Sequence, residues 1–433
     1  MYWGKKQMET IKNIVGKICK KIYDKINDIK FAEVSKMRKE DFSRQRKVGF
    51  GDTILIILNK TGKGLNAAIR AFRETVQRGN ETYSKQAFSK GRMRIKWQAL
   101  KEIFGDTVKE FYGEFEWKKY KGYRVSAIDG TKINLPYNEA SKEEFGIQSG
   151  TGETIQALAS CLYDTLNGII LDACIEPCQS SERKLAQEHL DCLSEIRSDK
   201  ELITFDRGYP SAELLELLEN KGFKYLIRAD YTFVKGIMKK VNSDDCIVCH
   251  TFVKSKISVK VRVLQIHLKD SKNNDINEIL LTNIFDDDFT PEDFKELYHL
   301  RWGIETKYDD IKNKLKIESF SGTSPLAIRQ DFFATMFLNN LASIMIAENA
   351  DEIDELHNSE QNKYQYKANI NTTVSLLSEK VIQLFIVSRR EQKKILKFIY
   401  SEIQHSVIPV RPNRSNPRHR KHKSSHFSQN QKS

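Results

Sequence analysis

Apolar residues at helical spacing dominate the first 110 residues of the chain. Within residues 12–29 they recur every three or four positions, which predicts an amphipathic helix. The same pattern covers residues 65–76. Either Thr82 or Ser84 can then cap a further helix, whose polar side chains include Lys85, Gln86, Lys90 and Arg92. We therefore expect the N-terminal part to be helical.

Two helices joined by a short turn, the second rich in Lys, Gln and Arg, resemble a helix-turn-helix reader of the DNA major groove. On this basis residues 1–115 are predicted to form a helical DNA-binding domain, with DNA contacts at Lys85, Gln86, Lys90 and Arg92. The alternative is a basic helical bundle that only packs against the rest of the protein, since a charged helix is commonly just a solvated face.

From Tyr123 onward the apolar residues form the short runs and alternations typical of strands. The first three strands are predicted at residues 123–129, 154–163 and 168–175. Helices capped by Ser181 and Ser211 then alternate with strands at residues 201–206 and 223–229. The predicted order is three strands, a helix, a strand, a helix and a strand. This is the order of an RNase H-like domain, an α/β fold with a mixed central sheet.

The rest of the chain divides into a strand-rich stretch and a helical end. Residues 230–289 are predicted to form an inserted β subdomain, and a long helix runs from Thr290 to about Leu315, with Pro291 at its first position. The catalytic domain is then expected to comprise residues 120–229 and 290–347, followed by a helical region at 348–404. A basic tail at 405–433 contains few apolar residues and is predicted to be disordered.

Charge is distributed unevenly along the 433 residues, whose net charge is +13. Residues 1–100 hold 24 Lys and Arg against 9 Asp and Glu, and residues 405–433 hold 7 basic residues and no acidic one. The middle is acidic. Two basic ends around an acidic centre favour a polyanionic partner such as DNA, with a carboxylate-rich site between the ends.

No apolar run approaches the roughly 18 residues that a membrane span needs, and the first residues lack the apolar stretch of a signal peptide. A cytoplasmic location, at the nucleoid when DNA is bound, is therefore expected. The seven cysteines are read as free thiols. Cys246 and Cys249 with His250 match the c-type haem attachment pattern. That pattern belongs to exported proteins, so haem attachment is not expected here.

The helix after Thr290 carries the sharpest chemical signal. At 100° per residue, Tyr298, Arg301, Glu305 and Lys312 fall within about 60° of one another. Beside this polar stripe runs an apolar one, made of Leu297, Leu300, Ile304, Tyr308, Ile311 and Leu315. An ordinary surface ion pair between Arg301 and Glu305 would explain part of this pattern, so the helix alone decides nothing.

Two aspartates strengthen the case for a reactive site. Asp129 is predicted to end the first strand and Asp206 the fourth, and in this fold those strands are neighbours. Carboxylates that meet there, together with Glu305, would repel one another unless cations lie between them. Oxygen ligands suit Mg²⁺ or Mn²⁺. Two such ions can activate water and stabilise the leaving oxygen in phosphodiester chemistry.

These motifs resemble those of the insertion-sequence-four family of bacterial DDE transposases, whose signature is Tyr-(2)-Arg-(3)-Glu-(6)-Lys. Tyr298, Arg301, Glu305 and Lys312 match its spacing, and the segment that Asp206 opens resembles its second aspartate motif. The likeness extends over roughly residues 45–400.

The resemblance implies a metal-binding triad of Asp129, Asp206 and Glu305 with two Mg²⁺ ions, for which Mn²⁺ can substitute. It also implies phosphate contacts at Arg301 and Lys312, support of the DNA end by Tyr298, and a homodimer in the DNA complex. Relatives stack a tryptophan of the inserted β region on a flipped base. This insertion has no tryptophan, so Phe233 or Phe252 would take that place.

The expected function is thus a DNA transposase, with endonuclease and strand-transfer activity, that binds the terminal inverted repeats of an insertion sequence and its target DNA. Two alternatives remain: a DNA-binding regulator that has lost catalysis, and a repair or recombination nuclease on the same fold. The inverted-repeat sequence, the target preference and the use of a hairpin intermediate lie beyond what the sequence can tell.

Overall fold

The computed structural model describes residues 13–44, 47–59, 64–76, 84–148, 154–196, 200–269, 275–358 and 362–411. Described residues before position 115 are helical or form turns. Their helices are α2 (Ile14–Ile26), α3 (Ile29–Ser35), α4 (Phe50–Leu58), α5 (Leu65–Thr75), α6 (Lys85–Arg92) and α7 (Gln98–Glu114). Ser84 caps α6, since its side chain accepts a hydrogen bond from the backbone of Ala87. Thr82, the other predicted cap, lies outside the described residues.

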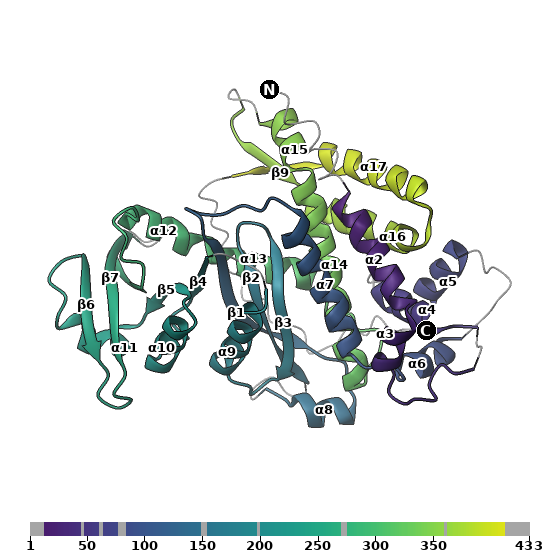
Figure 1. Ribbon diagram of the computed structural model, residues 1–433, viewed down its shortest axis with the longest axis horizontal. Coiled ribbons are helices and arrows are strands. Elements are labelled where there is room, and N and C mark those ends of the chain that lie inside the picture. The colour runs from purple at the N-terminus through teal and green to yellow at the C-terminus, as the bar shows by residue number, and fades with distance from the viewer. Residues whose placement is uncertain are drawn as a thin grey trace.

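A mixed sheet forms the centre of the molecule (Figure 1). In the described part of the chain it has eight strands in the order β3-β2-β1-β4-β5-β8-β7-β6. The strands are β1 (Arg124–Asn134), β2 (Gln156–Asp164), β3 (Ile169–Pro177), β4 (Glu201–Phe205), β5 (Lys224–Ala229), β6 (Asp245–Thr251), β7 (Ser258–Lys269) and β8 (Asp275–Thr282). β1 pairs antiparallel with β2 and parallel with β4, and β4 pairs parallel with β5. The predicted mixed α/β architecture is therefore confirmed.

The predicted β insertion is not separate from this sheet. β8 pairs antiparallel with β5, and β7 and β6 follow, so the main sheet continues through the insertion. The insertion also begins with a helix that the sequence pattern missed, α11 (Tyr231–Met238). A two-stranded pair at this place would leave a backbone edge unpaired, whereas pairing with β5 satisfies those groups.

Helices connect and cover the strands. They are α8 (Glu139–Phe145), α9 (Glu182–Leu193), α10 (Ala212–Asn220), α12 (Pro291–Leu300), α13 (Trp302–Asp309), α14 (Pro325–Glu348), α15 (Ala350–His357), α16 (Ile370–Ile386) and α17 (Arg389–His405). Ser181 and Ser211 cap α9 and α10 as predicted. The expected long helix after Thr290 is interrupted, because Arg301 separates α12 from α13 and a π-helical turn, η1 (Asp310–Lys314), follows α13.

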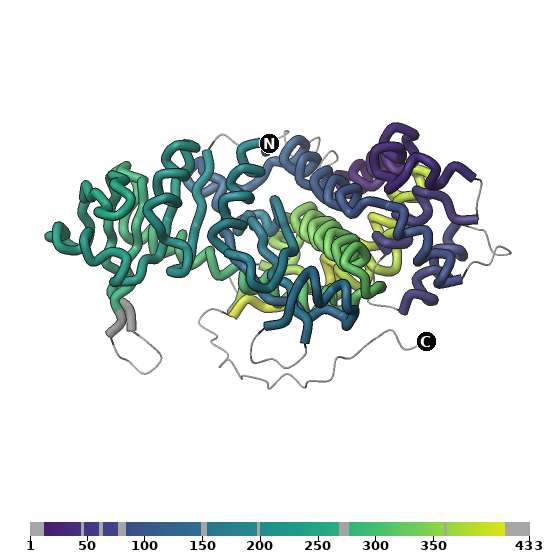
Figure 2. The backbone as a smooth tube through the Cα atoms, turned by 90° about the horizontal axis from the view of Figure 1, so that it is seen from below, coloured from purple at the N-terminus to yellow at the C-terminus, as the bar shows by residue number. Residues whose placement is uncertain are grey.

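Helix α14 is the centre of the hydrophobic core. It is buried on nearly all sides and packs against α7, β3, α16 and α4. Its Asn340 exchanges hydrogen bonds of 3.0 and 2.9 Å with the backbone of Ile170 on β3. Most buried apolar residues from Ile14 to Ile403 belong to one cluster, and a second, smaller cluster joins β1, β4, β5, β7 and β8 to α12. The N-terminal helices therefore share a core with the sheet instead of forming an isolated bundle. Helix α7 lies centrally beside β3 and α14, and α4, α5 and α6 lie at the opposite end of the molecule from β6 and β7 (Figures 1 and 2).

The C-terminal segment begins with a strand. β10 (Val407–Val410) pairs antiparallel with β9 (Gln365–Ala368), so the prediction of a disordered tail from residue 405 is wrong for its first part. The pairing gives residues 407–410 backbone partners that composition alone does not reveal. The basic residues after Arg411 lie outside the described residues. In the described part, none of the helices is both long and apolar enough to cross a bilayer.

Candidate active site

The strand register brings the two predicted aspartates together. β1 and β4 run parallel with Ala127 opposite Thr204. Two positions further along each chain segment are Asp129 and Asp206, so the same register places them side by side. Asp206 was predicted to end the fourth strand, and it is the first residue after β4, one position beyond the strand's end at Phe205. Asp129 does not end its strand, because β1 continues to Asn134 along β2; what ends at this point is its pairing with β4.

Arg301 links Glu305 to this pair of strands. One guanidinium nitrogen of Arg301 lies 3.0 Å from Glu305 Oε1, and another lies 3.9 Å from Asp129 Oδ2. The Arg301 side chain is buried at 3% exposure, with the rings of Tyr298 and Trp302 within 6 Å of its guanidinium carbon. Glu305 and Asp129 are thus held on either side of one buried cation. Arg301 faces carboxylates here and not solvent, so a direct phosphate contact would require it to move.

The other two signature residues also reach the aspartate strands. The Tyr298 hydroxyl donates a hydrogen bond of 3.2 Å to Asp206 Oδ1. The Lys312 ammonium donates to Thr131 Oγ1 at 2.5 Å and to the carbonyl of Lys132 at 2.9 Å. Lys312 belongs to the π-helical turn, so the α-helical projection used in the sequence analysis does not hold at this residue. Its side chain nevertheless lies beside β1, just beyond Asp129.

Burial sets the electrostatics of Asp129. Burial raises the pKa of Asp129 from 3.8 to about 6. The hydrogen bond from the Gly130 amide and the charge of Arg301 lower this pKa, whereas the carboxylates of Glu182 and Glu305 raise it further. The Gly130 amide donates a 2.9 Å hydrogen bond to Asp129 Oδ1. Burial also raises the pKa of Tyr298 well above 10, so its hydroxyl keeps the proton that it donates to Asp206. The site therefore concentrates negative charge in a partly desolvated place.

The donors that meet here suit a divalent metal ion. They are carboxylates, the ligands that Mg²⁺ and Mn²⁺ prefer. Two buried polar atoms at the site, Oη of Tyr209 and Nε of Arg301, have no hydrogen-bond partner within the described residues, and a hydrated cation could supply one. The described chain contains no three Asp, Glu, His or Cys side chains already grouped to hold an ion, and the Arg301 guanidinium lies between Asp129 and Glu305. Both carboxylates are partly exposed, and each would have to turn from its contact with Arg301 toward a shared cation.

The sequence analysis missed three neighbours of this site. Tyr308 was assigned only to the apolar stripe. Its ring is buried there, but its hydroxyl also donates a 2.6 Å hydrogen bond to the carbonyl of Asp129. Tyr209 lies in the second aspartate motif, and Glu182 follows the predicted cap of α9. A tyrosine on the apolar face of a helix, such as Tyr308, commonly serves only packing. An acidic residue in the first turn of a helix, such as Glu182, commonly serves only the helix. The sequence therefore offered no signal strong enough to select them as site residues.

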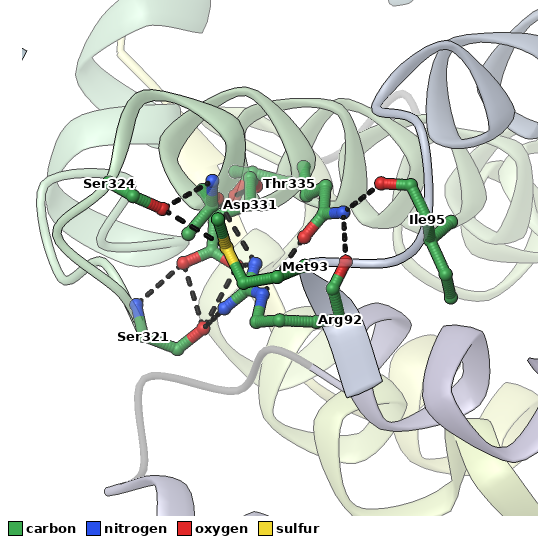
Figure 3. Close-up of polar contacts among 9 residues, drawn as sticks. Arg92, Met93, Ile95, Ser321, Ser324, Asp331 and Thr335 are labelled. Atoms are coloured by element: carbon green, nitrogen blue, oxygen red, sulfur yellow. Dashed lines mark hydrogen bonds and ion pairs between the residues drawn. The ribbon is translucent and has the colours of Figure 1, made fainter. Parts of the chain in front are cut away.

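Helix α6 carries the four residues predicted to contact DNA, and these residues differ in how deeply they are buried. Gln86 and Lys90 are exposed and Lys85 is half-buried, so these three can meet a partner. Arg92 cannot, and its prediction as a DNA contact is wrong. Its side chain is 2% exposed and donates to Gln330, Ser321, the carbonyl of Ala327 and Asp331 (Figure 3). A buried arginine is held by its carboxylate partner, and Asp331 is fully buried as well.

The two phenylalanines considered for base stacking pack against each other. The ring centroids of Phe233 and Phe252 are 5.3 Å apart, and His250 meets Phe252 edge-on at 4.9 Å. Both rings are half-buried. Stacking on a base would therefore exchange one aromatic contact for another. Cys246, Cys249 and His250 of the rejected haem pattern lie in strand β6.

The family model described as Transposase DDE domain matches residues 120–341, just over half of the chain, and includes Asp129, Asp206 and Glu305. The chain therefore belongs to the Transposase DDE domain family. It is a DNA transposase, and its activity is DNA transposition. Among solved structures it is similar to the piggyBac transposase synaptic complex with hairpin DNA, at 11% identity and a TM-score of 0.42, over 90% of this chain and 85% of that chain. A search of curated proteins gave no match.

Proposed function

We propose that this transposase belongs to the insertion-sequence-four family, binds the terminal inverted repeats of its element, and catalyses metal-dependent strand cleavage and strand transfer there. The observation that carries the proposal is the convergence of the signature residues on the two aspartates. Tyr298 bonds to Asp206, Arg301 joins Glu305 to Asp129, and Lys312 reaches the strand just beyond Asp129. A surface ion pair would account for the contact between Arg301 and Glu305 but not for the contacts with Asp206, Asp129 and the strand beyond it.

In this proposal Asp129, Asp206 and Glu305 hold the divalent cations, with Mg²⁺ as the natural ion and Mn²⁺ as a substitute. Bound cations would lower the pKa of a water nucleophile and stabilise the leaving oxygen. Tyr298 orients the Asp206 carboxylate, and Arg301 keeps Glu305 beside Asp129. Lys312 would meet a phosphate flanking the reactive bond, because its ammonium lies at Thr131 and Lys132, just beyond Asp129 on β1.

The fold supports the rest of the assignment. The order β3-β2-β1-β4-β5, with β4 and β5 parallel to β1, is the arrangement expected of an RNase H-like core. We further propose that residues 120–229 and 290–347 form the catalytic core, that the helices before residue 115 contact the repeat, and that two copies bridge two element ends. The basic N-terminal hundred residues favour this DNA contact, since cationic surfaces bind phosphate backbones.

Isosteric changes of the triad test the proposal. Asp129→Asn, Asp206→Asn and Glu305→Gln keep side-chain shape and remove a ligand charge, so each should lower Mg²⁺-dependent cleavage of a repeat-end duplex at least about 1,000-fold. Binding of the duplex in a gel-shift assay should change little. The control is Asp309→Asn, an exposed change on the same helix.

Three outcomes would contradict the proposal. Substantial cleavage by any triad variant would remove that residue from the site. Equal cleavage of repeat and unrelated duplexes by the wild-type chain would favour a repair nuclease instead. Binding of the repeat by a wild-type chain that cleaves nothing in Mg²⁺ or Mn²⁺ would favour the silent regulator.

A further inference from the structure

The N-terminus of α9 lies across both aspartate motifs. α9 packs on β1, β2 and β3 (Figure 1). The Arg183 guanidinium donates a 3.0 Å hydrogen bond to the carbonyl of Gly208, in the loop that Asp206 opens. The preceding residue, Glu182, reaches in the other direction and covers Gly130, the residue after Asp129. One helix turn is therefore attached to the second motif and lies over the first.

Gly130 makes the approach of Glu182 possible. A Cβ at this position would lie 3.1 Å from Oε1 of Glu182 and 3.2 Å from its carboxyl carbon. Contacts that short are uncommon for real Cβ atoms, so a residue other than glycine would require the Glu182 carboxylate to shift by a few tenths of an ångström. The glycine does not serve a turn, since it lies inside β1. Its absent side chain lets a fourth carboxylate approach the backbone beside Asp129.

A second observation at the same place points to a ligand. The Tyr209 hydroxyl is buried and has no hydrogen-bond partner within the described residues. It lies within electrostatic reach of Asp129, Glu182 and Asp206. A buried hydroxyl without a hydrogen-bond partner is energetically costly, so its position within reach of three carboxylates fits a further group at the site. A hydrated divalent cation supplies both the positive charge and the missing hydrogen-bond partner.

We propose that Glu182 is a fourth carboxylate of the metal site and binds the cation that Asp129 binds. This inference rests on the proposed function of Asp129, Asp206 and Glu305. The plainer role for Glu182 is that of a first-turn acid that favours the positive end of α9, worth about 0.3–1 kcal/mol to the fold. That role requires neither the contact with Gly130 nor the nearby unsatisfied hydroxyl, and it predicts no effect on metal binding.

The test measures Mn²⁺ binding to the full chain without DNA, by calorimetry. Glu182→Gln keeps the shape of the side chain and should weaken Mn²⁺ affinity by about 10-fold or more, the usual loss for a residue that supports a metal site. The control is Glu188→Gln, an exposed change on the same helix, which should leave affinity unaltered. Asp129→Asn is measured in parallel, and thermal unfolding confirms that all four chains are folded.

The parallel variant separates two kinds of failure. If Asp129→Asn abolishes Mn²⁺ binding and Glu182→Gln leaves it unchanged, the present inference is overturned and the proposed function stands. If Asp129→Asn also has no effect, the metal triad itself is wrong.

Gly130→Ala gives an independent check on the geometry. The added methyl should push the Glu182 carboxylate away, so it should weaken Mn²⁺ binding in the wild-type background and have little further effect in Glu182→Gln. If the losses of Mn²⁺ affinity caused by Gly130→Ala and Glu182→Gln are fully additive, the proposed coupling between Gly130 and Glu182 is overturned.

The wild-type chain gives a further test by metal-directed cleavage of its backbone. Bound Fe²⁺, with ascorbate and peroxide, should cut the backbone at residues 181–183 as well as at both aspartate motifs. Cuts at the aspartate motifs alone would contradict the role of Glu182.

Discussion

The hydroxyl of Tyr298 donates its hydrogen bond to the carboxylate of Asp206, although the two residues lie 92 positions apart in the sequence. This contact joins the first residue of the helical signature to the second aspartate motif. It leaves the other Asp206 oxygen available to a ligand. The signature tyrosine is therefore a positioning residue for a carboxylate, which makes the effect of its removal predictable.

Tyr298→Phe removes the hydroxyl and keeps the buried ring. A hydrogen bond to a charged group contributes about 1.5–3 kcal/mol, so cleavage of a repeat-end duplex should fall roughly 10- to 100-fold. Tyr231→Phe, which changes an exposed ring, is the control and should cleave normally. Cleavage by Tyr298→Phe at the wild-type rate would show that Asp206 needs no orientation.

Lys312 should act on DNA and not on the cation. Lys312→Ala is expected to reduce cleavage about 10-fold while Mn²⁺ affinity stays within about twofold, because its ammonium contacts Thr131 and the Lys132 carbonyl, beyond Asp129 on β1. Lys312→Arg should restore part of the rate, since it keeps the charge. The exposed Lys295→Ala serves as the control. A loss of Mn²⁺ affinity as large as that of a triad variant would refute the assignment.

The raised pKa of Asp129 predicts opposite pH trends for stability and for metal binding. Burial raises its pKa from 3.8 to about 6, so the folded state holds the proton more tightly than the unfolded chain. The associated stabilisation is complete below pH 4 and is lost as the pH rises through 6. Without metal, the wild type should lose about 1 kcal/mol relative to Asp129→Asn between about pH 5 and about pH 7.

Mn²⁺ affinity should rise over the same interval, because only the deprotonated carboxylate binds the ion. Urea unfolding and calorimetry at the two pH values measure both trends. Asp287→Asn, which changes an exposed aspartate, should show no such difference from the wild type. The opposite result would be a wild-type chain that becomes more stable relative to Asp129→Asn as the pH rises. It would mean that the charge of Arg301 lowers the pKa of Asp129 by more than burial raises it.

Arg92 and Lys90 should separate folding from DNA binding on one helix. Arg92→Ala leaves Asp331 buried without its cation and should destabilise the protein by about 3–5 kcal/mol in urea unfolding. Lys90→Ala changes an exposed residue and should alter stability by less than about 0.5 kcal/mol. A small effect of Arg92→Ala would show that the remaining partners of Asp331, Ser321 among them, satisfy its carboxylate.

The exposed part of α6 is expected to contact the repeat. Changing Lys85, Gln86 and Lys90 together to alanine should weaken repeat binding. It should also reduce the slope of log affinity against log salt concentration by the amount expected for about two phosphate contacts, because fewer counterions are released. Arg92 is left intact, so a loss of binding cannot come from unfolding. The measurement is the slope of affinity against salt concentration. An unchanged slope would place the DNA elsewhere.

Much of the architecture followed from local pattern. The caps at Ser181, Ser211 and Thr290, the apolar strand runs and the spacing of Tyr298, Arg301, Glu305 and Lys312 are properties of neighbouring residues. Periodicity and capping chemistry act over one or two turns, so the sequence reveals them. The alternation of strands and helices was enough to predict a mixed sheet and to place two aspartates on neighbouring strands.

Tertiary structure decided the features that depend on distant contacts. Arg92 looks like a DNA-binding residue by composition, but Asp331, 239 positions away, holds it inside the core. Residues 230–289 alternate like a separate β unit, but β5 offers an edge that β8 pairs with. Glu182 resembles an ordinary first-turn acid until Gly130 is found beneath it. In each case the partner is selected by packing across the whole chain, because burial and backbone pairing depend on long-range contacts that no local pattern records.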